Sequence, residues 1–181
     1  ELRVAEANNF GHDLDAMAKL VDANTRVVFI ANPNNPTGNW LSIVEIEKFL
    51  RQIPQNVIVV LDEAYHEYVD KPDYASGLTI LKQFPNLIVS RTFSKAYGLA
   101  GLRVGYCISN HEIADLLNRL REPFNVNSLA LAAAEVVLDD ADYLARGLAV
   151  NREGMKQLET GLRDLGLPFV ESAGNFVLVN F

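Results

Sequence analysis

The sequence predicts an α/β fold, a three-layer sandwich built on a mostly parallel sheet. Short runs of apolar, β-branched residues alternate along the chain with segments of helical spacing. These runs are continuous rather than alternating, which is typical of strands covered on both faces by crossover helices. With 181 residues, 49% of them hydrophobic and 22% charged, the chain has the size and composition of one large globular domain.

The strands of the main sheet are expected where the apolar runs are densest. They are residues 26–31, 57–61, 87–90 and 105–109. Residues 1–7 and 175–181 also have the composition of strands. Because the first segment begins at Glu1 and the last stops abruptly, we expect both ends to have been cut from something larger.

The segments between the strands have helical spacing. Ser42 is the expected N-cap of the first helix, and Glu45, three residues on, is its capping-box partner. Further helices are expected at residues 111–121 and 128–165. The second of these segments is expected to form two helices that part near residues 139–140, where two aspartates are adjacent.

Composition excludes several classes of function. The net charge is −7 and no cluster of Lys and Arg stands out, so a nucleic-acid partner is not expected. No apolar run approaches the roughly 20 residues that span a bilayer, so no membrane partner is expected. The single cysteine, Cys107, rules out an internal disulfide and suits a cytoplasmic location. The three histidines lack metal-ligand spacing, so no metal site is predicted.

Polar residues follow three of the predicted strands at the point where each strand ends. The three segments are Asn32–Gly38, Asp62–Tyr65 and Thr92–Lys95. Ligands of open α/β sheets bind outside the carboxyl ends of the strands, and parallel strands bring these ends to one edge. The sequence therefore predicts one binding site assembled from all three segments.

Two charged residues in these segments are candidates for chemistry. Asp62 follows the apolar run 57–61, where a carboxylate would be partly desolvated and would need a cationic partner. The alternative for Asp62 is a helix cap or a surface ion pair. Lys95 could be an ordinary surface charge, but Thr92, Ser94 and Arg103 near it offer the donors of a phosphate cradle. The spacing of a P-loop is absent.

Other residues at this edge have simpler interpretations. By composition alone, Asn32–Gly38 would be only a turn-rich loop, and Tyr65 only a half-buried aromatic side chain. Neighbours along a strand point to opposite faces, so Glu63 is expected to point away from Asp62 and either to cap or to pair structurally. For the same reason His66 is expected to have a structural or solvent-facing role.

Together, these motifs resemble the fold-type I pyridoxal-phosphate-dependent aminotransferases. The likeness rests on the ordered set Asn32–Gly38, Asp62–Tyr65, Ser94–Lys95 and Gly101–Gly105. A narrower resemblance, to histidinol-phosphate aminotransferases, is carried by Pro123–Leu129 and Ser172–Leu178. The resemblance runs over essentially the whole chain and implies the large domain of such an enzyme, in part.

The resemblance implies a pyridoxal 5'-phosphate cofactor and a role for each matching residue. Lys95 would bind the cofactor as a Schiff base and later move the proton between substrate and cofactor. Asp62 would pair with the pyridinium nitrogen, while Asn35 and Tyr65 would hydrogen-bond the phenolic oxygen. Three side chains would hold the phosphate: Thr92, Ser94 and Arg103. The family also often has a cis peptide bond at the position of Asn35–Pro36.

The resemblance further implies an activity and a domain arrangement. The reaction would be transamination of histidinol phosphate with 2-oxoglutarate in histidine biosynthesis, by a homodimer. Residues 1–165 would be the later part of the large domain with its linking helices, and residues 166–181 the start of a small domain. The family's earlier glycine loop, its partner-subunit tyrosine and its C-terminal arginine are not found here. We therefore expect this chain alone to be inactive.

Three alternatives keep the cofactor and change the function. The protein could be another class I or II aminotransferase, such as one acting on aromatic amino acids. It could be a pyridoxal-phosphate-dependent decarboxylase of an amino-acid phosphate. It could also be a regulatory domain that binds the cofactor without catalysis, although nothing in the chain resembles a DNA-binding segment.

Overall fold

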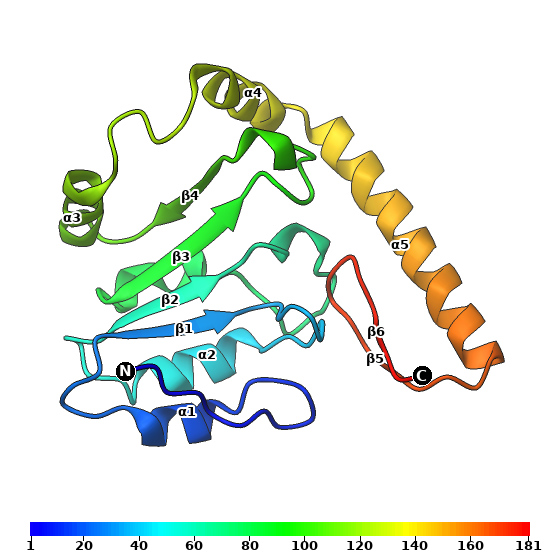
Figure 1. The fold of residues 1–181 in the computed structure, drawn as a ribbon, viewed down its shortest axis with the longest axis horizontal. Coiled ribbons are helices and arrows are strands. Elements are labelled where there is room, and N and C mark those ends of the chain that lie inside the picture. Colours follow the sequence, from blue (N-terminus) through cyan, green and yellow to red (C-terminus); the bar gives the residue numbers. More distant parts are fainter.

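A computed structural model describes residues 1–181 and places a four-stranded sheet at the centre of the fold. The strands lie in chain order: β1 (Val27–Ala31), β2 (Ile58–Asp62), β3 (Leu87–Thr92) and β4 (Gly105–Ile108). The first three are parallel, and β4 runs antiparallel to β3 (Figure 1). The predicted α/β class with a mostly parallel sheet is confirmed.

The register of the sheet brings the strand ends to one edge. Asp62, the last residue of β2, pairs with Ala31 of β1 and with Ser90 of β3. On the far side of β3, Thr92 pairs with Gly105, the first residue of β4. The segments that follow β1, β2 and β3 therefore leave the sheet at nearly the same level, as the sequence predicted.

The helices cover the sheet and then lead away from it. Those before the third strand are α1 (Leu14–Leu20) and α2 (Ile43–Leu50). After the sheet come α3 (His111–Leu120), α4 (Ser128–Asp139) and the 24-residue helix α5 (Ala141–Asp164). A separate two-stranded antiparallel sheet ends the chain, formed by β5 (Phe169–Val170) and β6 (Leu178–Val179).

Side-chain caps set the helix boundaries. The Ser42 hydroxyl accepts the Glu45 N–H at 3.3 Å, and the Glu45 carboxylate accepts the Ser42 N–H at 2.8 Å, so the predicted capping box is confirmed. The predicted division of residues 128–165 into two helices is confirmed as well. Asp140 leaves helical geometry at this point, and its side chain accepts the Tyr143 N–H to begin α5.

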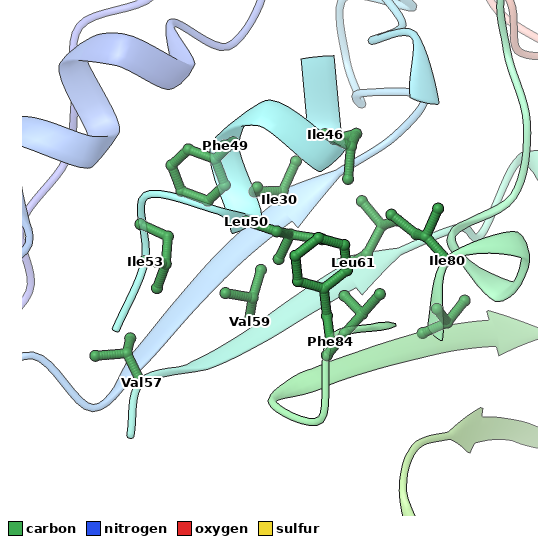
Figure 2. Close-up of a cluster of buried hydrophobic side chains, with 12 residues drawn as sticks. Ile30, Ile46, Phe49, Leu50, Ile53, Val57, Val59, Leu61, Ile80 and Phe84 are labelled. Carbon is green, nitrogen blue, oxygen red and sulfur yellow. The ribbon is translucent and has the colours of Figure 1, made fainter. Parts of the chain in front are cut away.

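The main core lies between the sheet and α2. Figure 2 shows α2 side chains Ile46, Phe49 and Leu50 directed at the sheet. The inward-facing strand residues are all about 1% exposed or less: Ile30, Val59, Leu61, Leu87 and Val89. Burying large aliphatic and aromatic side chains of this kind contributes roughly 1.5–3 kcal/mol each, so this layer anchors the parallel strands.

The opposite face of the sheet is less uniformly covered. On β1, Val27 is 45% exposed and Phe29 69% exposed, so the expected cover on both faces is incomplete at this strand. Beyond β3, a smaller apolar cluster joins the turn after that strand to α4. It consists of Phe93, Val104, Ala130 and Ala134.

Two strands expected at the ends of the chain differ from the structure. Residues 1–7 form no strand, because this segment makes no ladder with the sheet and leaves β1 as its edge strand. Its apolar side chains Leu2 and Val4 are 88% and 78% exposed. Of residues 175–181, only Leu178–Val179 is a strand, limited by the two residues of its partner β5.

No helix of the structure combines the length and apolar content needed to cross a membrane.

Candidate functional site

The loop after β1 is folded tightly enough to present Asn35 at the edge of the sheet. Both of its X–Pro bonds are cis, Asn32–Pro33 and the predicted Asn35–Pro36. The buried Asn32 side chain ties the loop to Leu41, donating to its carbonyl at 3.0 Å and accepting its N–H at 2.8 Å. Asn35, three residues after Asn32 in the loop, is exposed to solvent.

Tyr65, from the segment after β2, meets Asn35 at this edge. The Asn35 amide donates to the Tyr65 hydroxyl oxygen at 2.9 Å. Because that oxygen accepts from Asn35, the phenolic hydrogen remains available for a further acceptor. The Lys95 ammonium, from the segment after β3, lies 5.3 Å from the centroid of the Tyr65 ring. The structure thus brings together residues from all three strand ends.

Asp62 lies at the same edge but in a different environment from the one predicted. Its carboxylate accepts the Ala64 N–H at 3.0 Å, makes no salt bridge and is exposed to solvent. The expected partial desolvation is therefore wrong for this chain. The reason is geometric, since Asp62 is the last strand residue and its side chain projects past the apolar core.

The residues expected to bind an anion cluster around the turn after β3. The Ser94 N–H donates to the Thr92 hydroxyl oxygen at 3.0 Å. Arg103 has a left-handed backbone with φ of 53°, and its guanidinium donates to the Ala100 carbonyl at 2.8 Å and to the Ser94 hydroxyl at 3.4 Å. Two hydroxyls and one guanidinium therefore face the same turn, a donor set that suits a phosphate group.

Glu63 points to the other side of the sheet end, as predicted, and is fully buried. Its carboxylate accepts the Ser76 hydroxyl at 2.8 Å and the Gly77 N–H at 2.7 Å. It also pairs with the Arg91 guanidinium, through Nε at 2.9 Å and Nη2 at 2.7 Å. Three hydrogen-bond donors and the Arg91 charge satisfy both carboxylate oxygens, as a buried charge requires.

The sequence did not predict that Glu63 forms an ion pair with Arg91. Arg91 belongs to β3, and its side chain is only 11% exposed. The available signal was a charged residue close behind the apolar run Leu87–Val89, since a buried guanidinium needs an acid nearby. A second buried acid, Glu67, lies 3.9 Å from Arg91 and leaves one carboxylate oxygen without a hydrogen bond. Burial raises the pKa of Glu67.

His66 has the structural role that the sequence indicated. Its Nδ1 lies 3.1 Å from the Tyr74 hydroxyl, which donates to the Asn32 carbonyl at 3.3 Å. Burial lowers the pKa of His66, and the Arg91 guanidinium lowers it further against the opposing effect of Glu63. Burial raises the pKa of Tyr74, because it too disfavours the charged form of the side chain. This network fixes the segment behind Tyr65 to the base of the Asn35 loop.

No group of three or more His, Cys, Asp or Glu side chains is arranged to hold a metal ion. The edge instead gathers a primary amine, a free carboxylate, an amide–phenol pair and a turn with two hydroxyls and a guanidinium. The fold and these residues define an α/β protein with a candidate small-molecule site at the carboxyl ends of parallel strands.

Comparison with known proteins identifies the family. The model of the family described as aminotransferase class I and II matches residues 1–181. The chain belongs to the class I and II aminotransferases.

Individual relatives agree with this assignment. The chain is 59% identical over 180 residues to histidinol-phosphate aminotransferase 2 of Pseudomonas fluorescens, covering 99% of this chain and 49% of the relative. It is 56% identical over 174 residues to histidinol-phosphate aminotransferase 1 of Nitrosococcus oceani, covering 96% and 47%. The chain thus spans about half the length of the curated relatives it matches.

Solved structures share the same fold. Histidinol-phosphate aminotransferase of Sinorhizobium meliloti, in complex with pyridoxal-5'-phosphate, superimposes with a TM-score of 0.89 at 35% identity, covering 98% of this chain and 48% of that one. The histidinol-phosphate aminotransferase of Clostridium acetobutylicum gives 0.87 at 27% identity, covering 97% and 53%. These matches confirm the predicted α/β sandwich.

Replacing Glu63 with Gln is expected to lower the free energy of unfolding by about 3 kcal/mol, because it leaves the buried Arg91 charge without its counter-ion. Urea denaturation of the full-length protein measures this. The matched control is Asp115→Asn, which removes a carboxylate from the exposed pair with Arg119 and should cost less than about 1 kcal/mol. Equal losses in the two variants would contradict the account of Glu63.

His66→Asn is expected to change how stability depends on pH. The ordinary His pKa is 6.5 and the folded value is lower. Below about pH 6.5 the unfolded chain therefore binds a proton that the folded protein excludes, and the wild type loses stability as the pH falls through this window. The variant lacks this loss. Denaturation at several pH values should show that the difference in unfolding free energy between wild type and variant shrinks on acidification. A difference that does not change with pH would refute this role of His66.

Proposed function

We propose that the full-length protein is a pyridoxal-phosphate-dependent aminotransferase. The observation that carries the proposal is the convergence of Lys95, Asn35 and Tyr65 from three strand ends, with the Asn35 amide 2.9 Å from the Tyr65 hydroxyl and the Lys95 ammonium over the Tyr65 ring. Few small molecules need an amine, a hydrogen-bonding pair, a carboxylate and an anion site at one edge, and pyridoxal phosphate needs all four.

The donor set fits each part of the cofactor. Arg103, with the hydroxyls of Thr92 and Ser94, would bind the phosphate and so fix the ring without touching the reacting bonds. Asn35 and Tyr65 would donate to the phenolic oxygen, because the Tyr65 hydrogen is free. When bound, the cofactor supplies an electron sink that stabilises a carbanion next to the amino group.

The two charged residues would control protonation. A carboxylate at Asp62 favours a protonated pyridinium nitrogen, which makes the ring a stronger electron acceptor. Lys95 is proposed to attach the cofactor covalently and then to carry a proton on Nζ between substrate and cofactor carbons. Exposure of both side chains in this chain leaves them accessible to an incoming ring.

The proposed amino donor is histidinol phosphate and the proposed acceptor is 2-oxoglutarate, in histidine biosynthesis. Support comes from relatives named histidinol-phosphate aminotransferase at 54–59% identity over 93–99% of the chain's length in several organisms, with one at 51%. A second candidate is decarboxylation of an amino-acid phosphate. It is favoured by the similarity to L-threonine-O-3-phosphate decarboxylase of Porphyromonas gingivalis, with a TM-score of 0.73 at 27% identity.

We also infer the domain arrangement and the setting of the full-length protein. Residues 1–165 are proposed to be the later part of the large domain and residues 166–181 the start of the small one. The separate β5–β6 sheet at the far end of the long helix α5 supports this division (Figure 1). A homodimer in the cytoplasm is the proposed working form, on the family resemblance and the single cysteine.

Lys95→Ala is expected to abolish covalent attachment of the cofactor. Full-length protein is incubated with pyridoxal phosphate, reduced with borohydride and digested, and the modified lysine is located by mass spectrometry. The wild type should carry the label at Lys95 and the variant should carry none. Lys48→Ala is the control, because the Lys48 side chain is 70% exposed on α2. Labelling at another lysine, or none in the wild type, would refute the assignment.

The proposed substrate predicts an order of reactivity. With 2-oxoglutarate as acceptor, full-length protein should convert histidinol phosphate faster than tyrosine or phenylalanine, because the phosphate adds binding energy that an aromatic donor lacks. Formation of glutamate measures transamination, and release of carbon dioxide from threonine phosphate measures decarboxylation. Equal or faster turnover of the aromatic donors, or release of carbon dioxide as the main reaction, would overturn the proposed substrate.

A further inference from the structure

Phe176, near the end of the chain, covers the ring of Tyr65. The two rings meet edge to face, with centroids 5.0 Å apart and planes at 82°. Tyr65 is 6% exposed although it lies past the end of its strand, in a short turn. Tyr68 is the other aromatic neighbour, at 6.5 Å. The cover that Phe176 provides is therefore a large part of what fixes the plane of the Tyr65 ring.

The segment that carries Phe176 is fastened to the loop that carries Asn35. The Ala173 N–H donates to the Gly38 carbonyl at 2.9 Å. Gly38 has φ of +80°, and a Cβ added there would lie 2.2 Å from the Ser172 hydroxyl oxygen and 2.7 Å from the Ser172 Cα. Only glycine allows so close an approach. Figure 1 shows the segment between β5 and β6, which carries Phe176, beyond the carboxyl ends of β1 and β2.

A further contact holds the segment in place. Lys71, in the chain after Tyr65, pairs with Glu171 and lies 4.5 Å from the centroid of the Trp40 ring. Gly174 leaves room for the aromatic ring, since a Cβ there would lie 3.1 Å from Phe176. Residues 171–176 thus touch both the loop of Asn35 and the ring of Tyr65, the two members of one hydrogen-bonded pair.

We propose that Phe176 is a positioning residue that holds the Tyr65 ring in place. The Tyr65 hydroxyl oxygen then stays hydrogen-bonded to the Asn35 amide, and the Tyr65 hydroxyl hydrogen stays available for the cofactor's phenolic oxygen. This inference rests on the proposed function. It assigns to residues 171–176, in the predicted small domain, an influence on the protonation state of the bound cofactor. A segment that only filled space would affect stability and leave that state unchanged.

The test measures the cofactor bound to the full-length protein. Donors to the phenolic oxygen stabilise its anionic form, so weakening them raises the apparent pKa of the visible absorbance change of the cofactor–lysine chromophore. Phe176→Ala should raise this apparent pKa by about half a unit or more, in the same direction as Tyr65→Phe. In the Tyr65→Phe background, Phe176→Ala should add little, because both changes act on one contact.

Two further variants keep the result interpretable. Phe169→Ala removes a ring of the same size from β5, in the two-stranded sheet next to the Phe176 segment. There Phe169 stacks on Arg163 at 5.1 Å and makes no aromatic contact with Tyr65. It should leave the absorbance transition in place. Phe176→Leu preserves apolar volume and folding but lacks the flat ring edge, so it should shift the transition in the same direction as Phe176→Ala by a smaller amount.

A second readout needs no cofactor. In protein stripped of pyridoxal phosphate, nitration of Tyr65 by tetranitromethane, located by mass spectrometry, should increase severalfold in Phe176→Ala and stay at the wild-type level in Phe169→Ala. An absorbance transition that Tyr65→Phe moves and both Phe176 variants leave unchanged would overturn this inference alone. A wild-type protein that forms no visible chromophore would overturn the proposed function, and this inference with it.

Discussion

The rest of the structure depends on the buried ion pair between Glu63 and Arg91. Consecutive side chains at a strand end point to opposite sides, and Glu63 is held on the inner side by three hydrogen bonds and the Arg91 charge. Asp62 is therefore directed to the outer side, at the edge where the other polar residues gather. The same pair joins β2 to β3, since Arg91 lies in β3 directly before Thr92. One interaction thus fixes the strand that presents Asp62 relative to the strand that leads to Lys95.

The pairing also explains why a loop-rich site can be well ordered. Ser76 donates to Glu63 and accepts from Arg91, so the chain after the Asp62–Tyr65 segment returns and packs behind it. Tyr74, on the same return, contacts both His66 and the Asn32 carbonyl. The loop after β1 is thereby connected to the one after β2 by buried polar contacts. Sites on loops are precise when a rigid scaffold supports them, and here that support is a polar network beneath the edge.

Local sequence signals predicted much of this arrangement. Continuous apolar runs located the four strands, and the Ser42–Glu45 pattern located a helix start. The residues after each strand indicated the edge where polar side chains converge, because each of these features depends on neighbours in sequence. The contacts between Glu63 and Arg91 and between Tyr65 and Phe176 depend on strand register and on the return of the chain, which local patterns do not encode. The exposure of Asp62 escaped prediction for a related reason. An apolar run before a carboxylate shows where the strand lies. It does not show at which residue the strand stops being shielded from solvent.

The two acids beneath the site share the Arg91 guanidinium unequally. Arg91 is the single cation between two buried acids, and Glu63 takes the guanidinium contacts at 2.7 and 2.9 Å while Glu67 stands 3.9 Å away with an unpaired oxygen. A buried carboxylate without a full set of donors is costly in its ionised form, and burial accordingly raises the pKa of Glu67. The Arg91 charge is therefore balanced by Glu63 rather than by Glu67. The charged side chains that an incoming anionic cofactor meets at the edge itself are those of Asp62, Lys95 and Arg103.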